Sequence, residues 1–202
     1  MTSTTPATTI QIDPTPDDIQ SVEWVFAYGS LMWNPGFETV ARQPARLDGF
    51  HRAFCIYSHH YRGTPERPGL VLGLDAGGRC DGVAFRIEAA ARDGVIAYLN
   101  ERELTGYAYR PAVVDLTLED GRTVAAYTFV TDPGHPQYAG DLGPERSAEL
   151  IMSAAGNSGL NRDYLMNTLK QLESHGFRED SLHDLLIRVR HLTGLLDQGG
   201  GI

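Results

Sequence analysis

The sequence of 202 residues has only two cysteines, Cys55 and Cys80, and both lie in apolar stretches typical of strands. Two such thiols lack metal-ligand spacing and suit buried, reduced cysteines better than a disulfide framework. No segment has the ~20 apolar residues that a membrane-spanning helix needs. The first residues also lack the basic start and apolar run of a signal peptide. We therefore expect a soluble, cytoplasmic protein without a membrane partner.

Positive charge is scarce as well. The chain has 17 Lys and Arg against 26 Asp and Glu, a formal net charge of −9, and no basic stripe interrupts it. Such a molecule repels phosphate backbones, so we expect no nucleic-acid partner. If the ligand is itself a small anion, local arginines must attract it. The candidates are Arg62, Arg86, Arg102 and Arg110.

Several catalytic motifs are missing. Neither G-x-x-x-x-G-K-[ST] nor G-x-G-x-x-G occurs, which disfavours nucleotide binding. Seven histidines are present, but H-E-x-x-H is absent, and His183 and His191 lie two helical turns apart rather than one. We therefore expect no metal site. Because G-x-S-x-G is also absent, a serine hydrolase with Ser30 as its nucleophile is disfavoured.

The composition predicts one domain with short tails. The length suits a single core, and no Pro- or Ser-rich linker divides the middle of the chain. Residues 1–20 are rich in Thr, Pro and Asp, with only Ile10 and Ile12 to bury, which predicts a disordered N-terminal tail. The single domain is expected over 21–197 and a flexible C-terminal tail over 198–202.

Strand signals fill the first two thirds of this domain. The pattern predicts two hairpins, one turning at Gly77-Gly78 and one at Asp120-Gly121. Short strands paired by turns favour an antiparallel sheet whose edges are removed by closure into a barrel. The predicted strands cover residues 24–28, 50–58, 70–75, 80–88, 114–118 and 123–130.

Helical periodicity marks the last third. Pro144 suits the first position of one helix, Asn161 is predicted to cap the next, and Ser181 opens the last in capping-box spacing with Asp184. The regular apolar stripe of that last helix is interpreted as core packing rather than a dimer seam. The predicted fold class is α+β, a small, mostly antiparallel, closed β-barrel with surrounding helices.

One further helix, predicted over residues 91–107, carries a carboxylate on its apolar side. At ~100° per residue, Val95, Ile96 and Leu99 define a buried stripe, and Glu103 falls only about 40° from its centre. A carboxylate in this position must be paired with a cation, protonated, or used as a functional acid or base, because an isolated charge is costly to bury.

Two interpretations of Glu103 stay open at this point. One is a salt bridge with an arginine such as Arg110 or Arg62, and the other is a functional acid or base. Glu101 points to the opposite side of the helix and is interpreted as solvated.

The first predicted strand ends in Tyr28-Gly29-Ser30-Leu31, called the strand-end loop below. A Gly-Ser turn after a strand is most often only a turn. Successive backbone N–H groups around a glycine can nevertheless converge on an anion. The loop is therefore a candidate binding site for a small anionic substrate.

Five stretches in order carry a wider likeness: WVFAYGSLMWNPGF (24–37), HYRGTPERPGLVLGLD (60–75), GVAFRI (82–87), YLNERELTGY (98–107) and SAAGNSGLNRDYLMNTLKQL (153–172). Together they resemble the ChaC family of glutathione-specific γ-glutamylcyclotransferases over about residues 22 to 190. The resemblance implies a small barrel with packed helices. It also implies an enzyme that cleaves glutathione to 5-oxoproline and Cys-Gly, by attack of the α-amine on the γ-carbonyl, with no cofactor.

The resemblance assigns roles to individual residues. The family's glutamate falls on Glu103, which becomes the predicted catalytic base, and its strand-end loop falls on Tyr28, Gly29, Ser30 and Leu31 as predicted substrate-binding residues.

Two further substrate-binding candidates are Tyr138, in HPQYAG, and Arg62, for which an ordinary ion pair is the alternative. The sequence departs from the family pattern at Asp81, where many members carry tryptophan, and at Phe85, which replaces a tyrosine. Neither change touches Glu103 or the strand-end loop, so these changes bear on substrate preference rather than on activity.

Three functions remain to be separated. The first is cleavage of glutathione, the second is the same chemistry on other γ-glutamyl amino acids or amines, and the third is a module that binds such a metabolite without turning it over. A buried carboxylate disfavours the third, because a pure binder gains little from it.

Overall fold

The structure is a computed structural model that describes residues 9–106 and 108–199. Its contacts divide the chain into two compact units. The first unit contains the residues up to Arg52 and Leu74–Asp132, and the second contains Ala53–Gly73 and the residues from Pro133 onward. Because each unit draws on separate stretches of the chain, the prediction of one domain over 21–197 stays a prediction.

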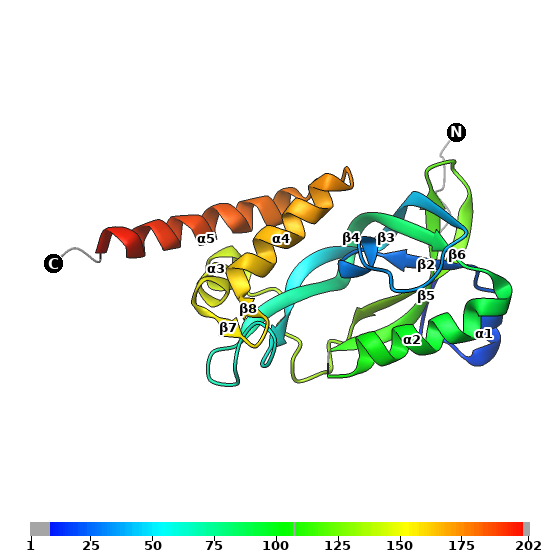
Figure 1. The fold of residues 1–202 in the computed structure, drawn as a ribbon, viewed down its shortest axis with the longest axis horizontal. Coiled ribbons are helices and arrows are strands. Elements are labelled where there is room, and N and C mark those ends of the chain that lie inside the picture. Colours follow the sequence, from blue (N-terminus) through cyan, green and yellow to red (C-terminus); the bar gives the residue numbers. More distant parts are fainter. Residues whose placement is uncertain (1–8, 107, 200–202) are drawn as a thin grey trace. The chain divides into compact units, whose positions relative to one another are not determined.

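The first unit is built on a closed β-barrel. The strands follow the order β5-β3-β4-β2-β6, and β6 pairs back with β5, so the ring of five strands closes (Figure 1). Among the described pairings, β2 with β6 is parallel, whereas β2–β4, β3–β5 and β5–β6 are antiparallel. The predicted α+β barrel is thus confirmed, with one parallel pair in it. The strands are β2 (Trp24–Ala27), β3 (Ala41–Ser58), β4 (Gly69–Arg86), β5 (Tyr109–Leu118) and β6 (Thr123–Thr131).

Alternation along the strands places apolar side chains in one core. On β5, Val114 and Leu116 are fully buried, and Leu118 is 2% exposed. These side chains belong to a cluster that also includes residues of β2, β3, β4 and β6. The predicted hairpin between β5 and β6 is confirmed, with Thr117 opposite Thr123 and Gly121 at φ +84°.

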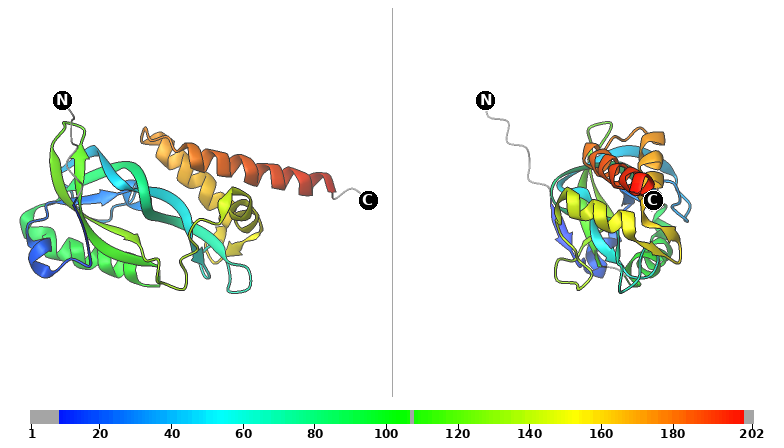
Figure 2. Two further views of the ribbon diagram at one scale, coloured as in Figure 1. Left: turned by 180° about the vertical axis from the view of Figure 1, so that it is seen from behind. Right: turned by 90° about the vertical axis from the view of Figure 1, so that its left-hand side faces the viewer.

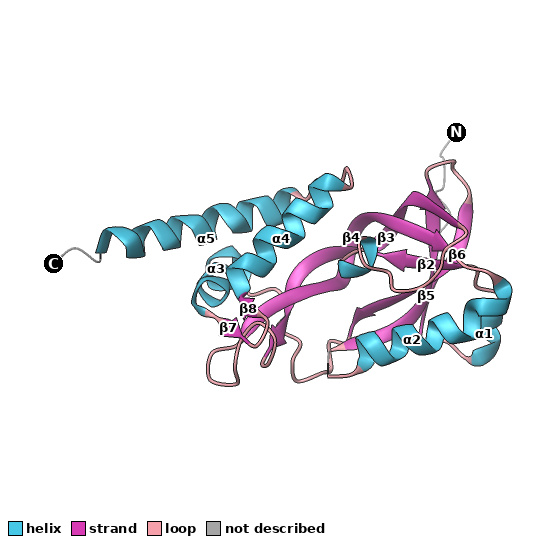
Figure 3. Cartoon of the chain, in the orientation of Figure 1, coloured by secondary structure: helices cyan, strands magenta, loops and turns pink. Residues whose placement is uncertain are grey.

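The predicted hairpin at Gly77-Gly78 is wrong. Both glycines have positive φ angles, +96° and +70°, but β4 runs through them as one strand (Figure 3). Glycines at positive φ also occur where a strand is locally irregular and then continues, and a sequence pattern does not separate the two cases. The ring nitrogen Nδ1 of His51, on β3, lies 3.0 Å from the carbonyl oxygen of Gly77.

The N-terminal tail is shorter than predicted. Residues 10–20 form β1 (Ile10–Ile12), which pairs antiparallel with β5, and α1 (Pro16–Gln20), whose capping box joins Thr15 and Asp18. The prediction counted buried side chains, but this segment is held by strand pairing and caps while Ile10 and Ile12 stay exposed. Residues 1–8 lie outside the described residues.

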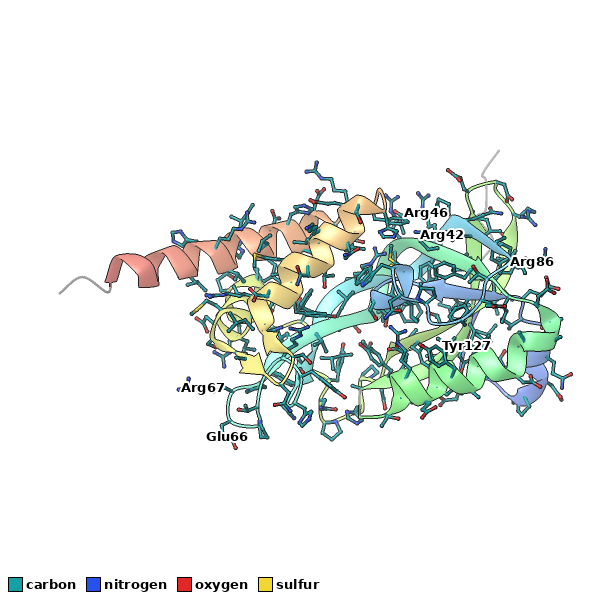
Figure 4. All side chains as sticks on the ribbon, viewed as in Figure 1. Arg42, Arg46, Glu66, Arg67, Arg86 and Tyr127 are labelled. Carbon is teal, nitrogen blue, oxygen red and sulfur yellow. The ribbon has the colours of Figure 1, made fainter. Side chains whose placement is uncertain are left out.

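Helix α2 (Arg92–Leu104) follows the short helix η2 (Ala89–Ala91) and packs along the barrel in the same unit (Figure 1). The predicted buried stripe of Val95, Ile96 and Leu99 is confirmed. Tyr127 points from β6 toward α2 (Figure 4), and its hydroxyl donates to Oδ1 of Asn100 at 2.7 Å. Burial raises the pKa of Tyr127 to about 12, so the phenol stays a neutral donor that fixes the helix to the barrel.

The second unit contains α3 (Gly143–Ser153), α4 (Asn161–Ser174) and α5 (Asp180–Gly199), with a two-stranded ladder of β7 (Ala155–Gly156) and β8 (Gly159–Leu160). The three helices contact one another and lie side by side in Figure 2. On α5, Leu182, Leu185, Leu186 and Val189 are buried, which confirms the predicted core stripe over these residues.

Two predicted helix starts and one tail need correction. Asn161 does not cap α4. Its buried side chain accepts from the Leu70 N–H and donates to the Leu70 carbonyl, both at 2.7 Å, because strand backbone in this unit offers both groups. Helix α5 begins at Asp180, so Ser181 lies in its first turn, and the helix continues to Gly199, past the predicted start of the tail. Residues 200–202 lie outside the described residues.

Two simpler expectations can also be compared with the structure. Cys55 and Cys80 are both buried thiols, as predicted. Among the described residues, no helix is long and apolar enough to span a membrane.

Candidate active site

The strand-end loop leaves the barrel where β2 ends. After Ala27 the chain enters the short helix η1 (Ser30–Met32), closed by hydrogen bonds from Met32 N–H to the Gly29 carbonyl and from Asn34 N–H to the Ser30 carbonyl, both at 2.9 Å. Leu31 and Met32 are buried, whereas Ser30 is exposed. The buried pair therefore anchors a turn whose serine side faces out.

The loop presents unused backbone donors. The first N–H groups of any helix have no acceptor within it. In the described part of the chain, the N–H groups of Gly29, Ser30 and Leu31 have no protein acceptor. Such groups are available to an anionic ligand or to water.

Arg52 supports this loop through hydrogen bonds, and the sequence pattern did not predict this role. It lies on β3 and is 2% exposed. Its Nε donates to the Tyr28 carbonyl at 2.6 Å, and Nη2 donates to the Asp81 carbonyl and lies 3.7 Å from Sδ of Met32. The signal was present in the sequence, because Arg52 shares the strand face of Phe50 and Phe54, where an arginine is unexpected.

Glu103 is the partly buried carboxylate that the helical pattern predicted. Its side chain is 19% exposed, and Oε1 lies 3.1 Å from Nε of Arg102. Among the described residues, its other oxygen, Oε2, has no hydrogen-bond partner. Burial raises the pKa of Glu103, and the Arg102 guanidinium opposes this rise without cancelling it. A carboxylate with one free oxygen and a raised pKa is suited to accept a proton.

The partners predicted for Glu103 were wrong. Arg110 pairs with Asp13, and Arg62 donates to the carbonyl of Ser158. Adjacent residues on a helix diverge by ~100°, so Arg102 was not expected to reach Glu103. Its long side chain turns back far enough for one contact.

Arg102 also contacts the strand-end loop. Nη2 donates to Oγ of Ser30 at 3.0 Å, and Nη1 donates to the Asn34 carbonyl at 2.7 Å and to the hydroxyl of Tyr98 at 3.1 Å. Glu103 and the strand-end loop, the two predicted parts of the site, therefore both contact the guanidinium group of Arg102.

The other arginines proposed to attract an anion contact neither feature. Arg86 pairs with Glu23 at 2.9 Å, and Arg110 pairs with Asp13. Of the four candidates, Arg102 is the one that the structure joins to Glu103 and the loop.

Arg62 and Tyr138 lie in the second unit. The guanidinium carbon of Arg62 lies 5.1 Å from the ring centroid of Tyr164, in addition to the bond to Ser158. Tyr138 forms an isolated antiparallel bridge with Ile56. Their roles in substrate binding stay predictions.

No metal-ligand cluster accompanies the site. Within residues 9–106 and 108–199, no group of three or more His, Cys, Asp or Glu side chains is arranged to hold a metal ion.

Comparisons with known proteins agree with the motif resemblance. The family model described as ChaC-like protein matches residues 23–192. A glutathione-specific gamma-glutamylcyclotransferase of Escherichia coli (strain K12) is 41% identical over 169 residues, which cover 84% of this chain and 73% of that protein. Gamma-glutamylcyclotransferase 2-3 of Arabidopsis thaliana is 33% identical, with 84% of this chain and 89% of that protein covered.

The fold is also found in solved structures. A yeast gamma-glutamyl cyclotransferase specific to glutathione superimposes with a TM-score of 0.72 at 24% identity, covering 84% of this chain and 98% of that one. At this identity the match supports the fold alone.

The raised pKa of Glu103 predicts an effect on stability. A carboxyl whose pKa is higher in the folded than in the unfolded state makes the protein lose stability as the pH rises through the folded value. Glu103→Gln removes the charge, so the variant should unfold at a higher urea concentration than the wild type at pH 7. The gain should shrink as the pH falls toward the ordinary glutamate range, near ~4.3.

Urea titrations followed by circular dichroism at several pH values measure this difference. Glu101→Gln, on the exposed side of the same helix, serves as the matched control and should show no comparable gain. A Glu103→Gln variant less stable than the wild type at pH 7 contradicts the assignment of burial as the dominant effect.

Proposed function

Because the chain belongs to the family of ChaC-like proteins, we propose that it is a glutathione-specific γ-glutamylcyclotransferase, which converts glutathione to 5-oxoproline and Cys-Gly. The observation that carries the proposal is Glu103, a carboxylate with a raised pKa and one open oxygen, joined through Arg102 to the strand-end loop. The name of the Escherichia coli relative supports glutathione as the substrate.

The reaction is an internal displacement. The α-amine of the γ-glutamyl group attacks its own γ-carbonyl carbon, the new C–N bond closes a five-membered ring, and the bond to the cysteine nitrogen breaks. Both reacting groups belong to one molecule, so the enzyme has mainly to hold the reactive conformation, remove a proton from the ammonium and stabilise the oxyanion. No external oxidant or cofactor enters this balance.

In this mechanism, Glu103 acts as the general base. The α-nitrogen loses two protons, one before it attacks and one as the ring closes, and Glu103 passes them in turn to the leaving nitrogen, which becomes the ammonium group of Cys-Gly. At the ordinary glutamate pKa of ~4.3 a carboxylate is a weak base toward an ammonium group, and burial on α2 improves the match by raising that pKa. Such a proton transfer typically contributes ~10² to 10⁴ in rate.

The strand-end loop supplies the electrostatic part of the mechanism. The backbone N–H groups of Gly29, Ser30 and Leu31, which follow Tyr28 in this loop, bind the α-carboxylate of the substrate or the oxyanion that forms at the γ-carbonyl. A preorganised donor in a site closed to water can contribute ~3 kcal/mol to transition-state stabilisation. Arg62 and Tyr138 are proposed as further substrate-binding residues.

The alternatives share part of this chemistry. A cyclotransferase for other γ-glutamyl amino acids or amines would need the same base and the same loop, and it differs only at the leaving-group side. A binding module without turnover would gain little from a carboxylate held in a protonatable state. We also propose that the protein works in the cytoplasm and binds no nucleic acid, in line with its net charge of −9.

A substrate assay separates the three functions. Purified protein is incubated with glutathione or with γ-Glu-Ala, and 5-oxoproline, Cys-Gly and alanine are followed. We expect 5-oxoproline and Cys-Gly from glutathione, and little product from γ-Glu-Ala. Equal rates on both substrates point to the broader cyclotransferase, and binding without product points to the module.

The same assay tests the base. Glu103→Gln keeps the shape and removes the basicity, so turnover of glutathione should fall by ~10² to 10⁴. Glu101→Gln, two positions earlier on the exposed side of α2, should keep wild-type turnover. If folded Glu103→Gln retains more than about a tenth of the wild-type rate, instead of losing the expected ~10² or more, Glu103 is not the base.

A second variant tests the strand-end loop. A side chain at Gly29 would block close approach of a ligand to the backbone donors. Gly29→Val should therefore lower turnover by more than about a hundredfold, the size of the loss when one oxyanion donor is removed. Gly194→Val, in α5 with open space around it, is the matched control for adding a branched side chain. A near-normal rate for Gly29→Val contradicts the proposed role of the loop.

A further inference from the structure

Arg102 occupies an unusual place between the two parts of the site. Its side chain is 22% exposed, and its three nitrogens point to different partners. Nε faces Oε1 of Glu103 at 3.1 Å, Nη2 donates to Ser30 at 3.0 Å, and Nη1 donates to the Asn34 carbonyl at 2.7 Å. The base and the loop that follows β2 are thus connected by one rigid group.

We propose that Arg102 is a positioning residue for the cyclisation: it holds the Glu103 carboxylate at a set distance from the strand-end loop and favours the ionised form of that carboxylate. The inference rests on the proposed function of this site and adds to it a residue that touches neither the reacting amine nor the γ-carbonyl.

The positioning role follows from the shape of the guanidinium. Arginine offers five N–H donors in a fixed plane, so partners on different sides are held at defined angles. A lysine ammonium is a single point with rotating donors and would not hold the base, Ser30 and Asn34 at the same time. Misplacement of a catalytic group by about 1 Å can cost about a hundredfold in rate.

The effect on ionisation follows from charge. Burial raises the pKa of Glu103, and Arg102 acts in the opposite direction. Among the described residues, Arg102 is the one charged side chain that acts on the pKa of Glu103. The hydroxyl groups of Ser30 and Tyr98 accept hydrogen bonds from Arg102 and carry no charge in these contacts. Removing Arg102 should therefore raise the pH at which Glu103 becomes a competent base.

The arrangement leaves one oxygen of Glu103 free. Arg102 contacts Oε1 through Nε alone, while its two terminal nitrogens bind Ser30, Asn34 and Tyr98. A two-point clamp on the carboxylate would occupy both oxygens and lower its basicity. The single contact orients the base without blocking it.

The test compares four variants with the wild type: Arg102→Met, Arg102→Lys, Ser30→Ala and Arg122→Met. For each folded variant, kcat and KM for glutathione are measured from pH 5 to 9. Arg122 forms an exposed ion pair with Asp120 at the turn between β5 and β6, so Arg122→Met controls for loss of an arginine and should behave as the wild type.

For Arg102→Met we expect kcat at pH 7 to fall about a hundredfold, and the acid side of the kcat/KM profile to move to higher pH. Arg102→Lys retains a positive charge, so its profile should move less while its kcat stays low. Ser30→Ala removes one loop contact and leaves the ion pair, so kcat should fall moderately without a shift of the profile.

Two outcomes would overturn the proposal. One is a folded Arg102→Met variant with kcat within about threefold of the wild type, far above the expected hundredfold loss. The other is a loss of kcat with an unmoved pH profile, which would leave Arg102 a purely structural role. If Arg102→Met does not fold, Arg102→Lys and Ser30→Ala carry the test, and a normal kcat in both contradicts positioning.

A double-mutant cycle separates failure of this inference from failure of the proposed function. Urea unfolding of the wild type, Arg102→Met, Glu103→Gln and the double variant needs no substrate. We expect Arg102→Met to be less destabilising in the Glu103→Gln background at pH 7, because the buried charge is then gone. An additive cycle contradicts the coupling between the two side chains, whether or not the wild type cleaves glutathione.

Discussion

The single contact between Arg102 and Glu103 is the interaction on which the rest of the site depends. A carboxylate that is well buried and unpaired would be protonated, and one that is fully paired would be a poor base. Glu103 lies between these limits, because burial raises its pKa while one guanidinium nitrogen opposes the rise. The same guanidinium bonds to Ser30, so the condition that makes Glu103 a base also fixes its place beside the strand-end loop.

The barrel provides the rigidity that such a site needs. Helix α2 is tied to β6 by the bond from Tyr127 to Asn100, and the strand-end loop is supported by Arg52 through the Tyr28 carbonyl. Tyr127 lies on β6 and Arg52 lies on β3, and both strands belong to the closed barrel, so the barrel holds both the base and the loop in place. Sites held by buried hydrogen bonds on regular elements keep their geometry better than sites on free loops.

The sequence predicted those features that follow from periodicity. The barrel strands and the position of Glu103 on the buried side of α2 arise from repeats of two and 3.6 residues, and the hairpin at Gly121 follows from its Asp-Gly turn. The sequence did not predict side-chain contacts that depend on which partners the tertiary structure brings close. Arg102 reaches its neighbour Glu103 only because its long side chain turns back, and Asn161 bonds to a strand rather than capping its helix. Local patterns also did not distinguish a continuing strand from a turn at Gly77.

The protonation of Glu103 itself tests this account most directly. In protein labelled with ¹³C at glutamate carboxyl groups, the Glu103 resonance is assigned by comparison with Glu103→Gln and followed by NMR as the pH is changed. The account predicts a pKa for Glu103 above the ordinary glutamate value of ~4.3. A value for Glu103 at or below the ordinary one would contradict the central claim, because the carboxylate would then be no better a base than any glutamate at the surface.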